Sequence, residues 1–191
     1  TTKRMKIYIK NMVCHRCKMI IISTFTSLNL HIQQVLLGEA DILEDLNQTQ
    51  LAELDNEIRK SGFEVLNNKK SILVEKIKLL VIQVVHSVDE HPIITNLSTF
   101  LSEELQLDYT YLATLFSTDQ GITIEKFYLK HRVERIKELL LYQELNITEI
   151  ARFLHYSSVA HLSNQFKLYT GLKPSQFKKM AHPHRIPLED I

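Results

Sequence analysis

A leucine, a phenylalanine, a glycine and a second phenylalanine recur at the same spacing twice in the second half of the chain, with an offset of fifty residues. The two copies are Leu112-Phe116-Gly121-Phe127 and Leu162-Phe166-Gly171-Phe177. In each copy the leucine and the first phenylalanine, four residues apart, share one face of a helix. The glycine five residues further on can end that helix in the left-handed conformation. We therefore predict one helix and its exit in each copy.

A second, shorter apolar helix is predicted before each copy, because Leu105 and Leu154 precede the repeated leucines by seven and eight residues. The first pair of helices is predicted at 96–105 and 108–117, and the second at 148–154 and 159–169, with Thr148 as a cap and Tyr156-Ser157-Ser158 as the turn. A long helix at 124–142 joins the pairs, and a last helix begins near Pro174. Two helix-turn-helix units of this kind are typical of DNA-binding proteins.

The first third of the chain has a different pattern, which predicts the order strand, helix, strand, strand, helix, strand. The predicted strands are 5–10, 31–37, 40–46 and 63–66, and the predicted helices are 17–28 and 48–60. A polar break at 67–70 precedes a long helix at 71–88, whose apolar residues cover more than one stripe. The predicted organisation is a domain at 1–67, a connecting helix at 68–92, an all-α domain at 93–180 and a flexible tail at 181–191.

Composition and charge narrow the classes of function. The formal net charge of the 191 residues is only +1, but residues 121–180 hold ten Lys or Arg against five Asp or Glu. The positive field is therefore expected on the second half of the repeat. No apolar run approaches the roughly 20 residues of a membrane span, and residues 1–10 lack the apolar stretch of a secretory signal. These features predict a cytoplasmic protein without a membrane segment.

The second repeat carries a more specific signature. Its positions in register are Ile150-Ala151, Leu154, Tyr156-Ser157-Ser158, Leu162-Ser163, Phe166-Lys167, Gly171-Leu172, Pro174 and Phe177. With these residues, 96–180 resembles the DNA-binding domain of the AraC/XylS transcriptional regulators, most closely over 147–179. The resemblance implies two helix-turn-helix units joined by a long helix, with recognition helices in successive major-groove segments on one DNA face. It also implies promoter or operator DNA as the partner, a homodimer, and RNA polymerase if the protein activates.

Residues that point outward from the two recognition helices are the candidates for DNA contact, because one helix fits the major groove. In the second unit we predict base contacts by Ala160, His161, Asn164 and Gln165, and phosphate contacts by Arg152, Ser158, Ser163 and Lys167. In the first unit the candidates are Tyr109, Thr110, Tyr111 and Thr114, with Thr118 at the edge. His161 and Asn164 could instead be ordinary surface residues. Lys126, Lys130, Arg132 and Arg135 fit a solvated face as well as phosphate clamps. Leu112, Leu115, Phe116, Leu162 and Phe166 are assigned to the core.

The only two cysteines of the chain form one Cys-x-x-Cys motif, Cys14 and Cys17, between a predicted strand and a predicted helix. Thiolates at a helix start can point at one ion, and soft ligands of this kind favour Cu(I) or Zn. Met12 and His15 are further candidate ligands. The motif and the strand-helix order together resemble the heavy-metal-associated domain, which implies a ferredoxin-like βαββαβ fold. Asn11 and Val13 depart from the residues that usually flank the methionine.

The sequence as a whole predicts an α+β domain, a connecting helix and an all-α domain with two helix-turn-helix units. The predicted function is a sequence-specific DNA-binding regulator of the AraC type that responds to a soft metal ion at Cys14 and Cys17. A metallochaperone-like metal-binding protein and a dithiol redox-sensing regulator are the alternatives, and the first domain could also serve only for dimerisation or packing. No Gly-rich phosphate loop and no Ser/His/Asp or Cys/His spacing is present, so no enzyme activity is predicted.

Overall fold

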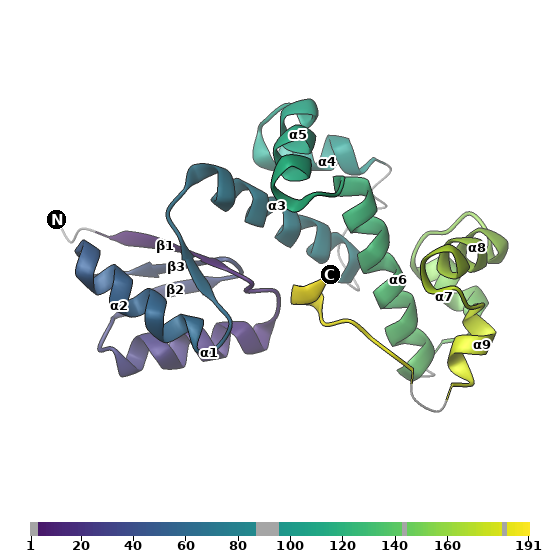
Figure 1. The fold of residues 1–191 in the computed structure, drawn as a ribbon, viewed down its shortest axis with the longest axis horizontal. Helices are drawn as coiled ribbons and strands as arrows, with labels where there is room; N and C mark the ends of the chain where they lie inside the picture. The colour runs from purple at the N-terminus through teal and green to yellow at the C-terminus, as the bar shows by residue number, and fades with distance from the viewer. Residues whose placement is uncertain (1–3, 87–95, 143–144, 181–182) are drawn as a thin grey trace. The chain divides into compact units, whose positions relative to one another are not determined.

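The computed structural model describes residues 4–86, 96–142, 145–180 and 183–191. It divides into two compact units, Thr1–Leu80 and Val81–Ile191, whose elements are labelled in Figure 1. The division falls within helix α3 (Lys69–His86), the helix predicted to connect the two domains.

The first unit has the predicted order of strands and helices. Its elements are β1 (Met5–Lys10), α1 (His15–Ser27), β2 (Ile32–Leu36), β3 (Glu39–Ile42), α2 (Gln48–Arg59) and β4 (Glu64–Leu66). The four strands form one antiparallel sheet in the order β2-β3-β1-β4. The helix α1 begins two residues earlier than predicted, at His15, so that Cys14 is its N-cap residue and Cys17 lies in its first turn.

The alternation of β1 decides which face of the sheet is buried under the helices. Ile7 and Ile9 point into a core that they share with Phe25 of α1 and Ile58 of α2. Tyr8 lies on the opposite face, where the Lys76 ammonium is 5.3 Å from the centre of its ring. The first part of α3 therefore covers the face of the sheet that α1 and α2 leave free, within the same unit.

The second unit is helical and confirms the predicted pairs of helices, with shifted ends. The first pair is α4 (Leu97–Leu105) and α5 (Tyr109–Gln120), and the second is α7 (Ile147–Phe153) and α8 (Val159–Thr170), with α6 (Ile124–Tyr142) between the pairs and α9 (Pro174–Lys178) after them. The prediction of Thr148 as the cap of α7 is wrong. Asn146 caps this helix through its side chain and a reciprocal bond with Glu149, so the helix begins at residue 147.

The repeated residues form the same scaffold in both copies. Gly121 and Gly171 end α5 and α8 with φ angles of 69° and 75°, in the left-handed region where glycine pays no steric cost. The ring centres of Phe116 and Phe127 are 5.3 Å apart, and those of Phe166 and Phe177 are 5.5 Å apart, edge to face in both cases. All four rings are buried, as are both repeated leucines. The assignment of these positions to the core is confirmed.

The C-terminal segment of the helical unit contacts α6. Of the predicted flexible tail, residues 183–191 are described, and here the Ile186 N–H donates to Glu134 at 3.1 Å while Arg185 lies 3.8 Å from Glu138. A short 3-10 turn follows at Leu188–Asp190. Among the described residues, no helix combines the length and the hydropathy that a membrane span requires.

Candidate functional site

The loop between α7 and α8 is built by a chain of local backbone contacts. His155 adopts a left-handed φ of 54°, and the N–H of Tyr156 then donates back to the Ala151 carbonyl at 2.8 Å. Ser158 caps α8 by accepting the His161 N–H at 3.0 Å. The turn therefore sets the direction in which α8 leaves.

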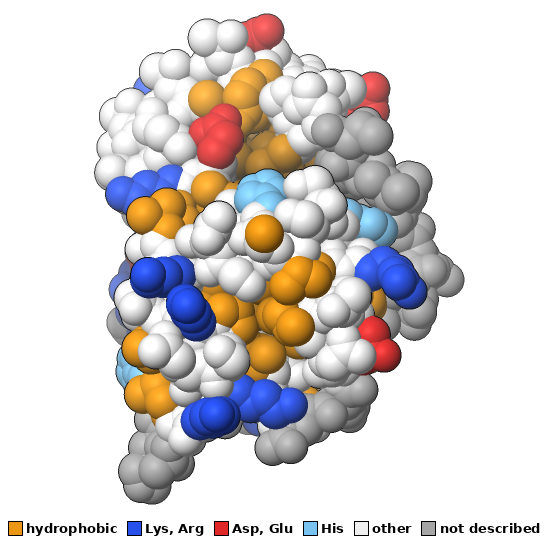
Figure 2. All heavy atoms as spheres, turned by 90° about the vertical axis from the view of Figure 1, so that its right-hand side faces the viewer, with side chains coloured by type: hydrophobic (Ala, Val, Ile, Leu, Met, Phe, Trp, Pro, Cys, Tyr) orange, Lys and Arg blue, Asp and Glu red, His pale blue; other side chains and the backbone are white. Residues whose placement is uncertain are grey.

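One stripe of α8 faces solvent, and we call it the α8 stripe. It consists of exposed residues at helical spacing: Ala160, His161, Asn164, Lys167 and Leu168. Figure 2 shows the face of the molecule on which α7, α8 and α9 lie, where most basic side chains are towards the lower end and most acidic ones towards the upper end. A helix with an exposed polar stripe and cations beside it has the shape and charge that suit a DNA major groove.

Tyr156 packs behind α8 and contacts two of its residues, Gln165 and His161. It is buried, its hydroxyl donates to Gln165 Oε1, and its ring meets the His161 ring edge to face at 5.3 Å. Burial raises the pKa of Tyr156 to about 12, so the hydroxyl remains a donor at neutral pH. The Arg132 guanidinium carbon also lies over the Tyr156 ring, 3.9 Å from the ring centre. We call Arg132, Tyr156, His161 and Gln165 the Tyr156 cluster.

The predicted contact residues of the second helix-turn-helix pair differ in exposure and in whether their polar atoms are already hydrogen-bonded within the protein. Asn164 and Lys167 are exposed, whereas the half-buried Gln165 has its oxygen engaged by Tyr156. His161 is exposed, but its Nδ1 lies 3.1 Å from the Ser157 hydroxyl, which leaves Nε2 as the nitrogen available to a ligand.

Arg152 is exposed on α7, and the hydroxyl of Ser158 is occupied as the cap of α8. Ser163 is half-buried and lines a shallow groove together with Lys173 and Lys178.

The predicted contact residues of the first helix-turn-helix pair form a corresponding stripe on α5. Thr110, Tyr111 and Thr114 are exposed, and the hydroxyl of Thr114 donates within the helix to the Thr110 carbonyl at 2.8 Å. Tyr109 differs from the others because it is half-buried and its hydroxyl donates to the Glu125 carboxylate. Burial and this hydrogen bond raise the pKa of Tyr109, and the same hydrogen bond lowers the pKa of Glu125. Tyr109 therefore ties the start of α5 to the start of α6.

The environments of two residues, Arg132 and Leu168, were not predicted from the sequence. Arg132 was predicted to be either a solvated residue or a phosphate clamp, yet it packs on Tyr156 and donates to the Leu154 carbonyl at 2.5 Å. Leu168 is 81% exposed on α8, an unusual environment for a leucine. Its position two residues after the core residue Phe166 is the sequence signal that could have placed it on the α8 stripe.

The cysteine motif lies at the start of α1 in the first unit. The sulfur atoms of Cys14 and Cys17 are 3.1 Å apart, and both side chains are half-buried. Burial raises the pKa of Cys17, and the hydrogen bond with Cys14 adds to this shift. Met12 is fully buried in the core against which Cys17 packs, and His15 is exposed. Within the described part of the chain, no group of three or more His, Cys, Asp or Glu is arranged to hold a metal ion.

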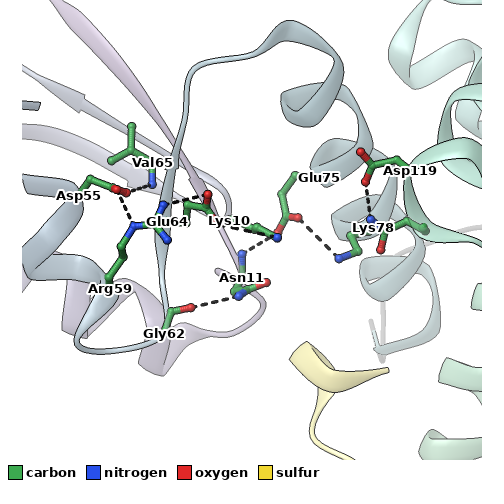
Figure 3. Close-up of polar contacts among 11 residues, drawn as sticks. Lys10, Asn11, Asp55, Arg59, Gly62, Glu64, Val65, Glu75, Lys78 and Asp119 are labelled. Carbon is green, nitrogen blue, oxygen red and sulfur yellow. Dashed lines mark hydrogen bonds and ion pairs between the residues drawn. The ribbon is translucent and has the colours of Figure 1, made fainter. Parts of the chain in front are cut away.

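The loop that carries Cys14 is anchored at its first residue, Asn11, as Figure 3 shows. The Asn11 N–H donates to Glu75 of α3 at 2.8 Å, and the Asn11 side-chain amide donates to the Gly62 carbonyl at 3.0 Å. Asn11 has a left-handed φ of 70°. Glu75 is buried, which raises the pKa of its carboxyl. The loop is thereby hydrogen-bonded to α3 within the first unit.

Comparisons with known proteins match the helical unit. A family model described as a helix-turn-helix domain matches residues 101–180. The Msm operon regulatory protein of Streptococcus mutans is 29% identical over 129 residues, covering 68% of this chain and 44% of that protein. The raffinose operon transcriptional regulatory protein RafR of Pediococcus pentosaceus is 33% identical over 79 residues, which are 41% of this chain and 28% of that protein. The chain thus aligns with less than half the length of either relative.

A solved structure gives the same indication. The C-terminal domain of AraT, a response regulator from Geobacillus stearothermophilus, has a TM-score of 0.50 and 25% identity to this chain, covering 63% of this chain and 92% of that one. These similar proteins are regulators, in agreement with the prediction that the chain is not an enzyme. With the two helix-turn-helix pairs and the repeated scaffold, residues 101–180 belong to the AraC-type helix-turn-helix family.

Proposed function

We propose that this protein is a sequence-specific DNA-binding transcriptional regulator whose α8 stripe reads base edges in the major groove. The observation that carries the proposal is the exposed row of His161, Asn164 and Lys167 on a helix fixed from behind by the Tyr156 cluster. The family of residues 101–180 and its similarity to two operon regulatory proteins support it.

The chemistry of each group assigns its role at the DNA. Asn164 can form a paired hydrogen bond with an adenine edge, and the Nε2 of His161 can contact a base acceptor or donor according to its tautomer. Lys167 and Arg152 supply positive charge for phosphates, which fixes the position of the helix rather than its base preference. Arg132 and Tyr156 contact no DNA in this arrangement and instead hold the turn and α8.

The partner in this proposal is double-stranded promoter or operator DNA, and the cytoplasm is the compartment where a bacterial-type operon regulator meets it. A homodimer and a contact with RNA polymerase remain predictions from the sequence.

Direct binding tests the proposal. The full chain, mixed with fluorescent duplexes carrying fragments upstream of its own gene, should bind one fragment more tightly than random duplex of equal length, as measured by anisotropy. Asn164→Ala should weaken that preference by about 1 to 3 kcal/mol. Thr99→Ala, an exposed position on α4, is the matched control and should change nothing. If every duplex binds equally weakly, the proposal is wrong.

We also propose a second function, in which the thiols of Cys14 and Cys17 respond to a soft metal ion or to oxidation. The supporting observation is their sulfur separation of 3.1 Å at the start of a helix. The first unit is proposed to be ferredoxin-like, supported by its strand order β2-β3-β1-β4 and the order of its elements. Two thiolates fit a two-coordinate Cu(I) ion, whereas Zn would need ligands from His15, water or another copy.

Oxidation is the alternative chemistry of the same pair. A disulfide needs a sulfur separation of about 2.05 Å, so a small rotation of the thiols suffices. Exchange with a low-molecular-weight disulfide would pass two electrons to that oxidant and form one bond between the two sulfurs, with the two thiol protons ending on the reduced product. The hydrogen bond from Asn11 to Glu75 would carry a change in the loop to α3.

The two chemistries are separated by titrating the full chain with Cu(I) under strict reduction and, separately, with oxidised glutathione. Cys14→Ser with Cys17→Ser should lose both responses, while His15→Ala, an exposed neighbour, should retain the two-sulfur site. A double serine variant that binds Cu(I) as tightly as the unmodified chain would contradict the metal proposal. A double serine variant that still responds to oxidised glutathione would contradict the redox proposal.

A further inference from the structure

The two helix-turn-helix units share a scaffold but differ in the charge around their recognition helices. Residues 147–170, which span α7 and α8, contain Arg152 and Lys167 against the single acid Glu149, and Lys173, Lys178 and Lys179 follow within 171–179. Residues 97–120, which span α4 and α5, contain no Lys or Arg and four acids, namely Glu103, Glu104, Asp108 and Asp119, and the matching residues 121–129 add Glu125 and Lys126. The same fold therefore carries opposite charge in its two copies. In Figure 2 most acidic side chains lie towards the upper end of the face, the end at which α4 and α5 are drawn in Figure 1.

The contrast extends to matching positions of the repeat. The stripe of α5 that corresponds to the α8 stripe consists of Thr110, Tyr111, Thr114, Ser117 and Thr118. The position of Lys167 is held by Ser117, so α5 lacks the cation that α8 presents. The hydroxyls of Thr114, Ser117 and Thr118 all donate to carbonyls of α5 itself. Only the acceptor capacity of these hydroxyls remains uncommitted.

The difference is sharpest at the helix start, which approaches the bases when a recognition helix enters the groove. The cap of α8 is the neutral Ser158, whereas the cap of α5 is Asp108, whose carboxylate accepts the N–H groups of Thr110 and Tyr111 at 2.8 and 3.3 Å. A carboxylate there offsets the positive end of the helix and would be repelled by phosphates if α5 entered a groove. The nearest cations along the chain, Lys126 and Lys130, lie on α6 rather than on α5.

The turns also differ, since three residues (106–108) separate α4 from α5 and five (154–158) separate α7 from α8. The first turn contains no aromatic residue, so the counterpart of the Tyr156 cluster is missing behind α5. The first helix-turn-helix pair consequently lacks the cations and the aromatic cluster of the second, and α5 is held instead by the hydrogen bond from Tyr109 to Glu125 of α6.

We infer that α8 alone enters a major groove, and that α5 stays out of the DNA rather than entering a second groove segment. This inference rests on the proposed function and limits its extent: each copy of the chain recognises one short segment of duplex, not two segments a helical turn apart. It differs from the expectation, drawn from the family resemblance, that both recognition helices read DNA.

Matched double variants test the inference on one duplex that the full chain binds specifically. His161→Ala with Asn164→Ala should weaken binding by at least about 5-fold, and by up to 150-fold if one bidentate contact is lost. Tyr111→Ala with Thr114→Ala, at the corresponding positions of the repeat, should change affinity by less than 2-fold, within the usual scatter of surface substitutions. Circular dichroism melting of both variants checks that each remains folded.

Hydroxyl-radical footprinting of the unmodified chain gives an independent readout. We expect protection over one groove segment for each bound copy of the chain, with the number of copies set by the binding stoichiometry. Protection at two segments about 34 Å apart by a single bound copy, or an equal loss of affinity in the α5 and α8 variants, would overturn the inference while leaving the proposed function intact. If the unmodified chain binds no duplex specifically, the proposed function fails and the inference fails with it.

Discussion

Individual residues show where local sequence spacing is informative and where it is not. The repeated phenylalanines could be assigned to the core because helical periodicity alone places them on one face, and all are buried. Arg132 could not be assigned, because its partner Tyr156 is 24 positions away in the sequence and packs against it only after the chain has folded. Asn146 was missed for another reason: Thr148 was placed as the cap although Asn146 and Glu149 have the spacing of a capping box.

Tyr156 is the residue whose removal should separate base preference from general affinity. Tyr156→Phe keeps the ring against Arg132 and His161 but removes the hydrogen bond to Gln165, at a cost of about 1 kcal/mol in the free energy of unfolding. The released Gln165 amide should alter which bases are preferred, with little change in binding to random duplex. Competition among single-base variants of a bound duplex measures this. An unchanged ranking of those duplexes would show that Gln165 is not positioned by Tyr156.

His86 makes the stability of the second unit sensitive to acid. Burial, with a smaller contribution from the nearby Arg135 and Arg185, lowers its pKa from 6.5 to about 4, while Glu138 raises it. Because the unfolded chain takes up the proton first, the free energy of unfolding should fall as pH decreases from about 6.5 to about 4. The loss attributable to His86 should be of the order of 2 kcal/mol between about pH 7.5 and about pH 5.

Urea unfolding at the two pH values checks this prediction. His86→Gln should show a smaller loss of stability on acidification than the unmodified chain, whereas the exposed His184→Gln should show the same loss. An identical acid response of the His86 variant and the unmodified chain would contradict the assignment.

At the scale of elements, the helices were predictable and their ends less so. The order of elements followed from periodicity and turn residues, and α6 has the predicted bounds. Ends that depend on capping or on tertiary contacts moved: α5 extends to Gln120 because Gly121, rather than Ser117, stops it. The helix α1 was predicted to begin at Cys17 but begins at His15, so Cys14 is its N-cap residue and Cys17 lies in its first turn. No side chain caps this helix, so no local sequence signal marked its start.

The two left-handed glycines offer a matched test of the repeat. A Cβ added at Gly121 or Gly171 would meet no atom within 4 Å, so alanine there adds only the cost of the positive φ. Gly121→Ala and Gly171→Ala should therefore each lower the free energy of unfolding by about 1 kcal/mol, and asparagine at either position should cost less. Chemical denaturation of the four variants gives the comparison. A large cost at one glycine and none at the other would show that the two exits are not equivalent.

At the scale of the whole molecule, the sequence predicted the two kinds of domain, and residues 101–180 are now placed in a known family. The difference in charge between the two helix-turn-helix pairs was only partly predicted, because the repeated Leu, Phe, Gly and Phe positions say nothing about the charged residues between them. Those charges carry the functional difference. The formal net charge of +1 likewise conceals the difference between an acidic first helix-turn-helix pair and a basic second one.

Salt dependence should report this distribution of charge. Each phosphate contact contributes about −0.9 to the slope of log K against log salt concentration, so Lys167→Ala should reduce the steepness of that slope by about 0.9. Lys70→Ala, an exposed lysine of the first unit, should leave the slope unchanged. Equal slopes for Lys167→Ala and the unmodified chain would show that Lys167 does not contact phosphate.

The central claim is that the α8 stripe determines which DNA sequence this protein binds. Its most direct test is selection from a pool of random duplexes, performed in parallel with the unmodified chain and with Asn164→Ala. The account predicts that the unmodified chain enriches one short motif and that the variant loses or changes the preference at one position within it. Enrichment of the same motif by both proteins, or of no motif by the unmodified chain, would contradict the claim.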